Sequence, residues 1–221
     1  MKQFLNKVLQ TIILLTGFVL HLAGQIPVEC LAGHQKATAD IMFFRYFLKN
    51  DKSPSHCLFF NRNRASVDYR ITSREYLPQF GFTEALSWNH PRLKGFAPVA
   101  VLQILNTGVY PKAGVQYVLL KKSWTVFTWA VCRTDAPEKA DHFLLLRFTP
   151  RISEHIHLFE QAESLLALDF GKQGSQALTL RFRSGVSYRQ WQAGAGADLF
   201  LFGSGWTSTS TNAGIFLRHE F

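Results

Sequence analysis

Charged side chains that recur at every second position carry the most evident chemistry in this sequence. Arg181 and Arg183 alternate with Leu180 and Phe182, so in a strand both guanidinium groups lie on one face. An acidic residue, Asp198, occupies an equivalent position in the next alternating run. Because guanidinium groups bind carboxylates and phosphates through directed donors, this face predicts either a network of ion pairs or a site for anions.

Histidines are the other candidates for chemistry. His155 and His157 are two residues apart and would share one face of a strand, and His142 precedes them. Neither cysteines nor paired carboxylates accompany them at metal-ligand spacing, so a polar pair near the membrane interface is favoured over a metal site. The sequence also lacks a serine-hydrolase elbow and a phosphate-binding loop. It therefore predicts no catalytic residue, no metal and no cofactor.

The elements that must position these side chains are strands with alternating faces. Gln176–Tyr188 and Trp191–Leu201 both alternate strictly, and only two residues separate them, which predicts a tight hairpin. Tyr188 and Trp191 flank that turn, where an aromatic girdle of a membrane protein would lie. Each run is about as long as a tilted strand that crosses a bilayer.

Further runs of similar length predict an all-β, antiparallel, up-and-down transmembrane β-barrel over residues 56–221. We expect about ten strands, with eight or twelve as alternatives, because such barrels have even numbers. Trp124–Arg133 is apolar on nearly both faces, and Gln79–Asn89 is mixed. Besides the hairpin and the last run, Asn212–Phe221, the expected strands are Leu58–Ile71, Gln79–Asn89, Phe96–Asn106, Pro111–Lys121, Ser123–Arg133, Asp141–Thr149 and Glu154–Leu168.

Residues 1–25 have the order of a secretory signal peptide. Lys2 and Lys7 precede the apolar run Val8–Leu22, and small residues follow it. The run is short for a membrane-spanning helix, which is the alternative. Gln25 stands where a lipoprotein signal would need cysteine, so we expect export without a lipid anchor.

Residues 26–55 do not fit the strand series. Thr38–Lys49 places Ile41, Phe44 and Phe47 on a shared helical face, which suggests an amphipathic helix. A plug inside the barrel and an extra strand are the alternatives, and the sequence leaves all three open.

The final strand resembles that of small Gram-negative outer-membrane β-barrel proteins of the porin-like type. Such proteins end in an amphipathic strand whose last residue is Phe, and Ile215, Leu217 and Phe221 match this pattern, whereas His219 departs from the usual aromatic. The resemblance implies an outer-membrane location, contact with outer-membrane lipid, and recognition of these three residues by the barrel-assembly machinery. It also implies that the short turns at the end carrying Phe221 face the periplasm.

If the apolar faces contact lipid, the charged faces line the lumen, since a charge facing lipid costs roughly 2–4 kcal/mol near the bilayer midplane. An interlocking Arg–Glu/Asp network that shuts the lumen is the favoured interpretation, and a narrow channel for small anionic solutes is the functional one. The predicted lumen residues are Arg62, Arg64, Asp68, Glu84, Gln116, Arg147, Glu163, Arg181, Arg183, Asp198 and Arg218.

The net charge of +9 first suggests nucleic acid as a partner. The basic residues are spread along alternating strands rather than gathered in a stripe, so we expect no nucleic-acid binding. The predicted function is a narrow porin-like channel or a structural envelope protein. The alternatives are a barrel enzyme, a subunit of an envelope transport complex, and a soluble lipocalin-like binding barrel in which the apolar face points inward.

Overall fold

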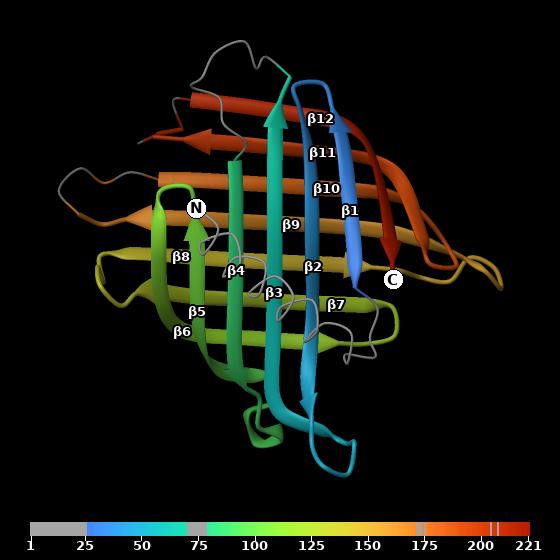
Figure 1. Ribbon diagram of the computed structural model, residues 1–221, viewed down its shortest axis with the longest axis horizontal. Helices are drawn as coiled ribbons and strands as arrows, with labels where there is room; N and C mark the ends of the chain where they lie inside the picture. The colour runs from blue at the N-terminus through green and yellow to red at the C-terminus, as the bar shows by residue number, and fades with distance from the viewer. Residues whose placement is uncertain (1–25, 70–78, 172–173, 175, 204, 207) are drawn as a thin grey trace, which may run out of the picture.

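The chain forms a closed antiparallel β-barrel of twelve strands (Figure 1). The computed structural model describes residues 26–69, 79–171, 174, 176–203, 205–206 and 208–221, so the predicted signal peptide lies outside it. The strands are β1 (Pro27–Gly33), β2 (Lys36–Leu48), β3 (Pro54–Asp68), β4 (Gln79–Trp88), β5 (Phe96–Leu105), β6 (Gly108–Leu120), β7 (Trp124–Arg133), β8 (Lys139–Phe148), β9 (Ile156–Asp169), β10 (Gln176–Tyr188), β11 (Trp191–Phe202) and β12 (Ser208–Glu220).

Every strand pairs with its neighbours in sequence, and β1 closes the ring against β12. The closing register runs from Pro27 opposite Glu220 to Gly33 opposite Gly214. In Figure 1, β2 to β5 cross steeply over the strands of the opposite wall, as expected when strands tilt strongly around a barrel. Closure leaves no unpaired sheet edge.

The structure corrects the expected strand count and the expected start of the barrel. Residues 26–55 contribute two full strands, β1 and β2, and the first two residues of β3, so the barrel begins at Pro27 rather than near residue 56. The helix considered for Thr38–Lys49 is wrong. Thr38, Asp40 and Met42 are buried while the residues between them are more exposed, which is the period of a strand. Ten expected strands plus these two give twelve.

Glycines allow the sheet to bend where β10, β11 and β12 meet. Gly185 pairs with Gly194 across β10 and β11. A Cβ atom at Gly194 would lie 2.5 Å from the Gly185 Cα and 2.1 Å from the Ser184 carbonyl oxygen, so no larger residue fits there. These glycines permit close strand approach and sharp curvature.

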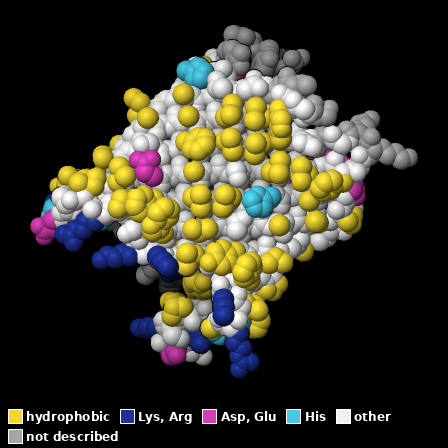
Figure 2. Space-filling view, turned by 180° about the vertical axis from the view of Figure 1, so that it is seen from behind, with side chains coloured by type: hydrophobic (Ala, Val, Ile, Leu, Met, Phe, Trp, Pro, Cys, Tyr) yellow, Lys and Arg dark blue, Asp and Glu magenta, His cyan; other side chains and the backbone are white. Residues whose placement is uncertain are grey.

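The outside of the barrel is apolar. In Figure 2 hydrophobic side chains spread over the face that is seen from behind, and basic side chains gather at its lower edge. The following outward-facing residues are each at least 40% exposed: Phe82, Trp88, Phe96, Val115, Trp124, Phe182, Tyr188, Trp191, Ile215 and Leu217. Within the described residues, no helix has the length and apolar character to cross a membrane.

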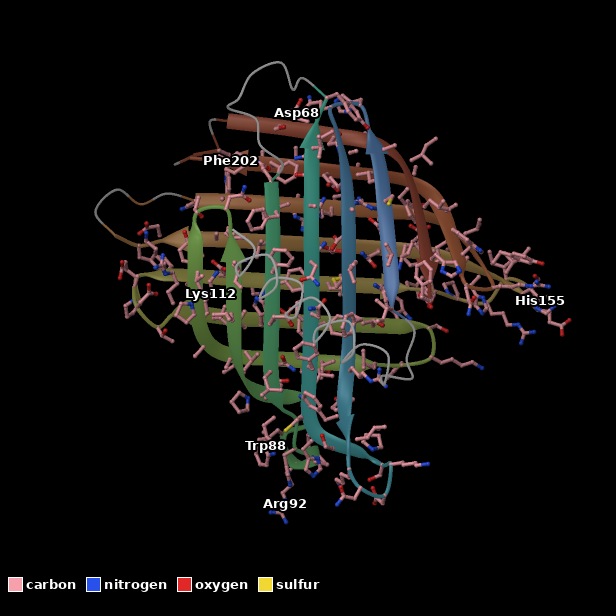
Figure 3. All side chains as sticks on the ribbon, in the orientation of Figure 1. Asp68, Trp88, Arg92, Lys112, His155 and Phe202 are labelled. Atoms are coloured by element: carbon pink, nitrogen blue, oxygen red, sulfur yellow. The ribbon has the colours of Figure 1, made fainter. Side chains whose placement is uncertain are left out.

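The short turns predicted for the end of the chain lie together at that end. Glu220 N donates to the Gln190 carbonyl oxygen at 3.0 Å, which places the β10–β11 turn beside the C-terminus. The β2–β3, β4–β5, β6–β7 and β8–β9 turns lie at the same end because every connection joins antiparallel neighbours. We call this the terminal end and the other the loop end. Figure 3 shows Trp88, Arg92 and His155 toward the terminal end, and Asp68, Lys112 and Phe202 toward the loop end.

Candidate functional site

The lumen is the candidate site, and it is divided into two halves of different character. We call the first the ionic half. It comprises charged side chains that point inward from β1, β2, β3, β9, β10, β11 and β12, namely Glu29, Asp40, Arg62, Arg64, Glu163, Arg181, Arg183, Asp198 and Arg218.

Arg62 spans the lumen. Its Nε donates to Asp40 Oδ1 at 3.1 Å, and a second donor binds the other oxygen of the same carboxylate. Its Nη1 donates to Glu163 Oε2 at 2.7 Å. Since β3 and β9 lie on opposite sides of the ring of twelve strands, the Asp40–Arg62–Glu163 bridge crosses the barrel.

Asp198 is the second centre of the ionic half. It accepts hydrogen bonds from Arg64 Nη2 at 2.6 Å and from Arg183 Nη1 at 2.8 Å. Arg183 Nε also binds Glu29 Oε1 at 2.8 Å, so the pairs continue to β1. The side chain of Asp198 is 0% exposed. A charge so enclosed is stable only with partners of opposite sign, and these two arginines supply them.

Arg218 of the ionic half and its neighbour Arg147 lie nearer the terminal end with weaker partners. Arg147 Nε donates to Gln161 Oε1 at 2.8 Å, and Arg218 Nη1 lies 3.5 Å from the same oxygen. Gln161 in turn donates to Glu163 Oε1 at 2.7 Å. Both guanidinium groups lie over the ring of Phe159, at 5.8 and 5.5 Å from its centroid. Arg218 Nη2 also lies 3.9 Å from Glu220 Oε1, so this arrangement joins the bridge to the terminal end through neutral, aromatic and loosely held ionic partners.

The other half of the lumen is apolar, and we call it the apolar half. Phe60 packs against Phe127 and Trp129 with ring centroids 5.2 and 5.1 Å apart, and Trp129 packs against Phe143 at 5.2 Å. Inward residues of β2 to β8 complete it, namely Met42, Leu58, Ala85, Val99, Val101, Val118, Val131 and Leu145. Sequence reasoning expected a polar lumen and missed this half. The signal was the run Trp124–Arg133, whose two faces are both apolar.

Most of the predicted lumen residues do point inward. Arg62, Arg64, Arg181 and Arg183 join the ionic half together with their acidic partners, as described above. The remaining inward members are Asp68 at the loop end of β3, Arg147, Arg218 and Gln116, which is 2% exposed. Sequence reasoning missed Glu29, Asp40 and Lys36, because it did not assign their segment to the barrel.

Glu84 is the exception, and the structure corrects its placement. Ala85 and Ser87 are the buried, inward residues of β4, so Glu84 lies on the outward face with Phe82 and Leu86. Asn61 faces it across the strand pair and donates to Glu84 Oε1 at 2.5 Å. The mixed pattern of β4 gave the wrong parity at this position.

The histidines do not converge. His142 points outward, where its Nε2 lies 3.1 Å from the Thr128 hydroxyl, and His157 belongs to the inward face at the terminal end of β9. Across the described ranges no group of three or more His, Cys, Asp or Glu side chains is arranged to hold a metal ion.

The loop end of the lumen holds a cavity of about 220 Å³. Phe60, Trp129 and Phe143 form its apolar wall, and Lys36, Arg64 and Arg181 form its cationic wall. A wider vestibule of about 470 Å³ adjoins it at the rim and shares Gln103 and Lys112 with it. On the terminal side of the bridge, a cavity among Glu29, Asp40, Gln161, Glu163 and Arg218 measures only about 10 Å³. The lumen of the described residues is therefore open at one end and filled at the other.

Comparison with known proteins gives likenesses of structure alone. No family model matches the chain, and no curated protein matches it. Among solved structures, the KdgM porin is similar over 89% of this chain and 99% of its own, with 8% identity and a TM-score of 0.45. The KdgM porin in complex with disordered oligogalacturonate gives the same coverage and identity and a TM-score of 0.46. A mutant of the Rh. blastica porin covers 90% of this chain and 99% of its own, with 8% identity and a TM-score of 0.28.

Proposed function

We propose that this chain is a porin-like β-barrel of the outer membrane whose lumen is shut at rest and admits small anionic solutes from the loop end. The observation that carries the proposal is the distribution of polarity. Arg62, Arg183 and Asp198 are buried inside the ring, whereas large apolar side chains such as Phe182 and Ile215 face outward and are at least half exposed. This is the arrangement that a bilayer requires of a barrel.

The same distribution opposes the soluble lipocalin-like alternative. A soluble barrel would bury the faces of Phe182, Val186 and Leu217 and expose the arginines, and the structure has the reverse. Aromatic residues on the outside near the terminal end, among them Trp88, Trp124 and Trp191, would then sit at the level of the lipid headgroups. In this proposal the terminal end faces the periplasm, and Ile215, Leu217 and Phe221 serve as the signal for the barrel-assembly machinery.

The proposed shut state is supported by the side chains that fill the two halves of the lumen. The Asp40–Arg62–Glu163 bridge crosses the ionic half, and the Phe60, Phe127 and Trp129 rings fill the apolar half. A solute that enters the loop-end cavity meets both. Passage then requires the bridge to open, because the aromatic packing is continuous with the barrel wall.

The first experiment tests the membrane location. The chain is expressed in a Gram-negative host, and the membranes are separated by density. We expect the protein with the outer membrane, and we expect its gel migration to change when the sample is heated. Recovery in the soluble periplasmic fraction would refute the proposal.

The second experiment tests the shut lumen. Purified protein is inserted into planar lipid bilayers, and single-channel current is recorded at several voltages. We expect long silent periods with brief openings that favour anions over cations, because arginines line the path. A steady, unselective current would contradict the shut state, and permanent silence would contradict solute passage.

A further inference from the structure

The cavity at the loop end has a cationic wall and an aromatic wall that face each other, and this pairing selects a class of ligand. We propose that the cavity binds a small amphipathic anion, a carboxylate carried on an aromatic or short aliphatic body. The inference rests on the proposed function and names the substrate class of the same lumen.

The cationic wall offers hydrogen-bond donors that the described residues leave unused. Arg64 gives Nη2 to Asp198, but its buried Nη1 lies 3.7 Å from Asp40 Oδ2 and makes no hydrogen bond. Arg181 reaches Glu163 only at 3.4 Å through Nη1, and its buried Nε makes no hydrogen bond. Buried donors without acceptors are costly, so an anion that accepts from both is favoured there.

Lys36 adds a third cation at the rim of the same wall. Its ammonium group lies 3.8 Å from the centroid of the Phe200 ring, and both residues line the cavity. The ammonium group adds positive charge at this rim, within electrostatic range of the Asp68 and Asp198 carboxylates.

The opposite wall rejects a polar ligand body. Phe60, Trp129 and Phe143 pack against one another, and Val101, Val131 and Leu165 extend the same surface into the cavity. A hydrophilic acid such as a sugar acid would leave its hydroxyl groups unpaired against these side chains. An aromatic or aliphatic body would bury its apolar surface there, and this burial would favour binding.

The size of the cavity sets the size of the ligand. An apolar cavity of roughly 150 Å³ accepts benzene. The 220 Å³ here accommodate one ring with a short acid side chain, and the adjoining vestibule leaves room for a longer one.

Lys112 does not take part in anion binding. Its ammonium group is bound to the Asp141 carboxylate and donates to Gln103 Oε1 at 2.7 Å, so its charge is already neutralised. The anion therefore binds on the side of Arg64 and Arg181, across the cavity from Asp141.

The test uses the full-length exported chain, purified and placed in lipid nanodiscs, after gel migration that changes on heating has shown that the barrel is folded. The binding of 3-phenylpropionate is measured by titration calorimetry. 3-Phenylpropanol, which lacks the carboxylate, tests the need for charge, and glucuronate, which carries a carboxylate on a hydrophilic body, tests the need for an apolar body. We expect saturable binding of the acid, binding of the alcohol at least about tenfold weaker, and no binding of glucuronate.

Two variants locate the site. Arg181→Gln should weaken the binding of 3-phenylpropionate at least about tenfold and leave the binding of 3-phenylpropanol unchanged. Leu165→Trp should abolish the binding of both compounds, because the larger side chain fills the cavity. Arg189→Gln is the matched control, because it removes an arginine from the β10–β11 turn at the terminal end. Gel migration shows whether each variant is folded before it is titrated.

Equal binding of acid and alcohol, binding of glucuronate, or the absence of saturable binding by the folded barrel would each overturn the inference. An effect of Arg189→Gln equal to that of Arg181→Gln would do the same. A protein that fails the folding and membrane criteria instead refutes the proposed function, so the two failures are distinguishable.

Discussion

The two halves of the lumen close the barrel by different means. In the ionic half, Arg62 reaches from β3 to Glu163 on β9, and each guanidinium group must find its acceptors at fixed positions. In the apolar half, Phe60, Phe127 and Trp129 fill space without directional demands. Closure of the ionic half depends on partners of opposite charge, and closure of the apolar half depends on the volume of its side chains.

This difference explains which half can move. Opening the aromatic packing would expose apolar surface and leave a void, whereas an ion pair can exchange its partner for water or for a solute anion without a change of volume. The cavity fits this division, since it lies where the two halves meet and takes one wall from each. In the proposed channel, the ionic half is thus the part of the lumen suited to gating, and the apolar half is its rigid support.

The largest effect is expected in the apolar half. Phe127 is 0% exposed, and Phe127→Ala removes a ring that contacts Phe44, Phe60 and Trp129. We expect a loss of about 4 kcal/mol in the free energy of unfolding, measured by urea titration in lipid vesicles. Phe170→Ala, in the exposed β9–β10 loop, is the control. A loss no greater than that of the control would show that this half is not packed as described.

The second largest effect is expected at the Asp40–Arg62–Glu163 bridge. Arg62→Met leaves Asp40 and Glu163 without their shared cation, so we expect a loss of about 3 kcal/mol in the same titration and longer open times in planar bilayers. Adding Asp40→Asn and Glu163→Gln removes the stranded charges.

The triple variant separates the two kinds of closure. It should regain part of the stability that Arg62→Met lost, since Glu163→Gln also removes the carboxylate partner of Arg181, while its open times remain long because the bridge is still absent. No companion substitution to a smaller residue should rescue Phe127→Ala in this way, since the void remains. A triple variant as unstable as the single one would contradict closure by charge pairing.

The sequence allowed the barrel itself to be predicted, and the reason is physical. Ten strands were located to within a few residues, because runs of strand length are separated by turn residues and most of the runs alternate with period 2, as in Gln176–Tyr188, which the structure matches at both ends. The same alternation placed Arg181 and Arg183 on one face, and in the structure both side chains are enclosed by the barrel. What alternation cannot show is which inward residues meet across the ring, as Arg62 and Glu163 do over 101 positions.

Two omissions have separate causes. A strand at β2 was left as one of three alternatives because Phe43 and Phe44 stand side by side, so helical and strand periods both fit the segment, and β1 was not expected. Glu29 and Asp40 belong to these strands, so they were not predicted as lumen residues, and the predicted set of acidic residues in the ionic half was incomplete. Glu84 was placed inward because its strand has polar residues on both faces, and only the burial of Ala85 and Ser87 in the folded barrel fixes its parity.

A smaller effect is expected at this outward pair. Glu84→Leu together with Asn61→Val removes two polar side chains from a face that otherwise shows Phe82 and Leu86. Since a carboxylate on the lipid side is unfavourable, we expect a gain of about 1 kcal/mol in stability in lipid vesicles. A loss of stability, or a change of oligomeric state by crosslinking, would show instead that this face meets a protein partner.

The smallest effect is expected for an exposed ion pair at the loop-end rim, beyond the enclosed part of the lumen, and it completes the comparison. Arg133 binds Asp135 through Nε at 2.9 Å and Nη2 at 2.5 Å, a geometry as good as that of Arg62, but the pair is at the surface. The hydrogen bonds from Arg133 lower the pKa of Asp135 below its usual value. A carboxyl group with a lowered pKa stabilises the fold above its unfolded pKa, and this contribution is lost as pH falls through the folded pKa.

Water and salt screen an exposed pair, so Asp135→Asn should leave the urea midpoint at neutral pH within experimental error. Any small difference that the pair makes should disappear only as pH falls below the lowered pKa of Asp135, because the wild-type carboxyl group of the folded protein is protonated only there. A shift at neutral pH comparable with that of Arg62→Met would mean that pairing geometry, rather than enclosure within the lumen, sets the strength of these ion pairs. The distinction between the ionic half and the surface of the barrel would then fail.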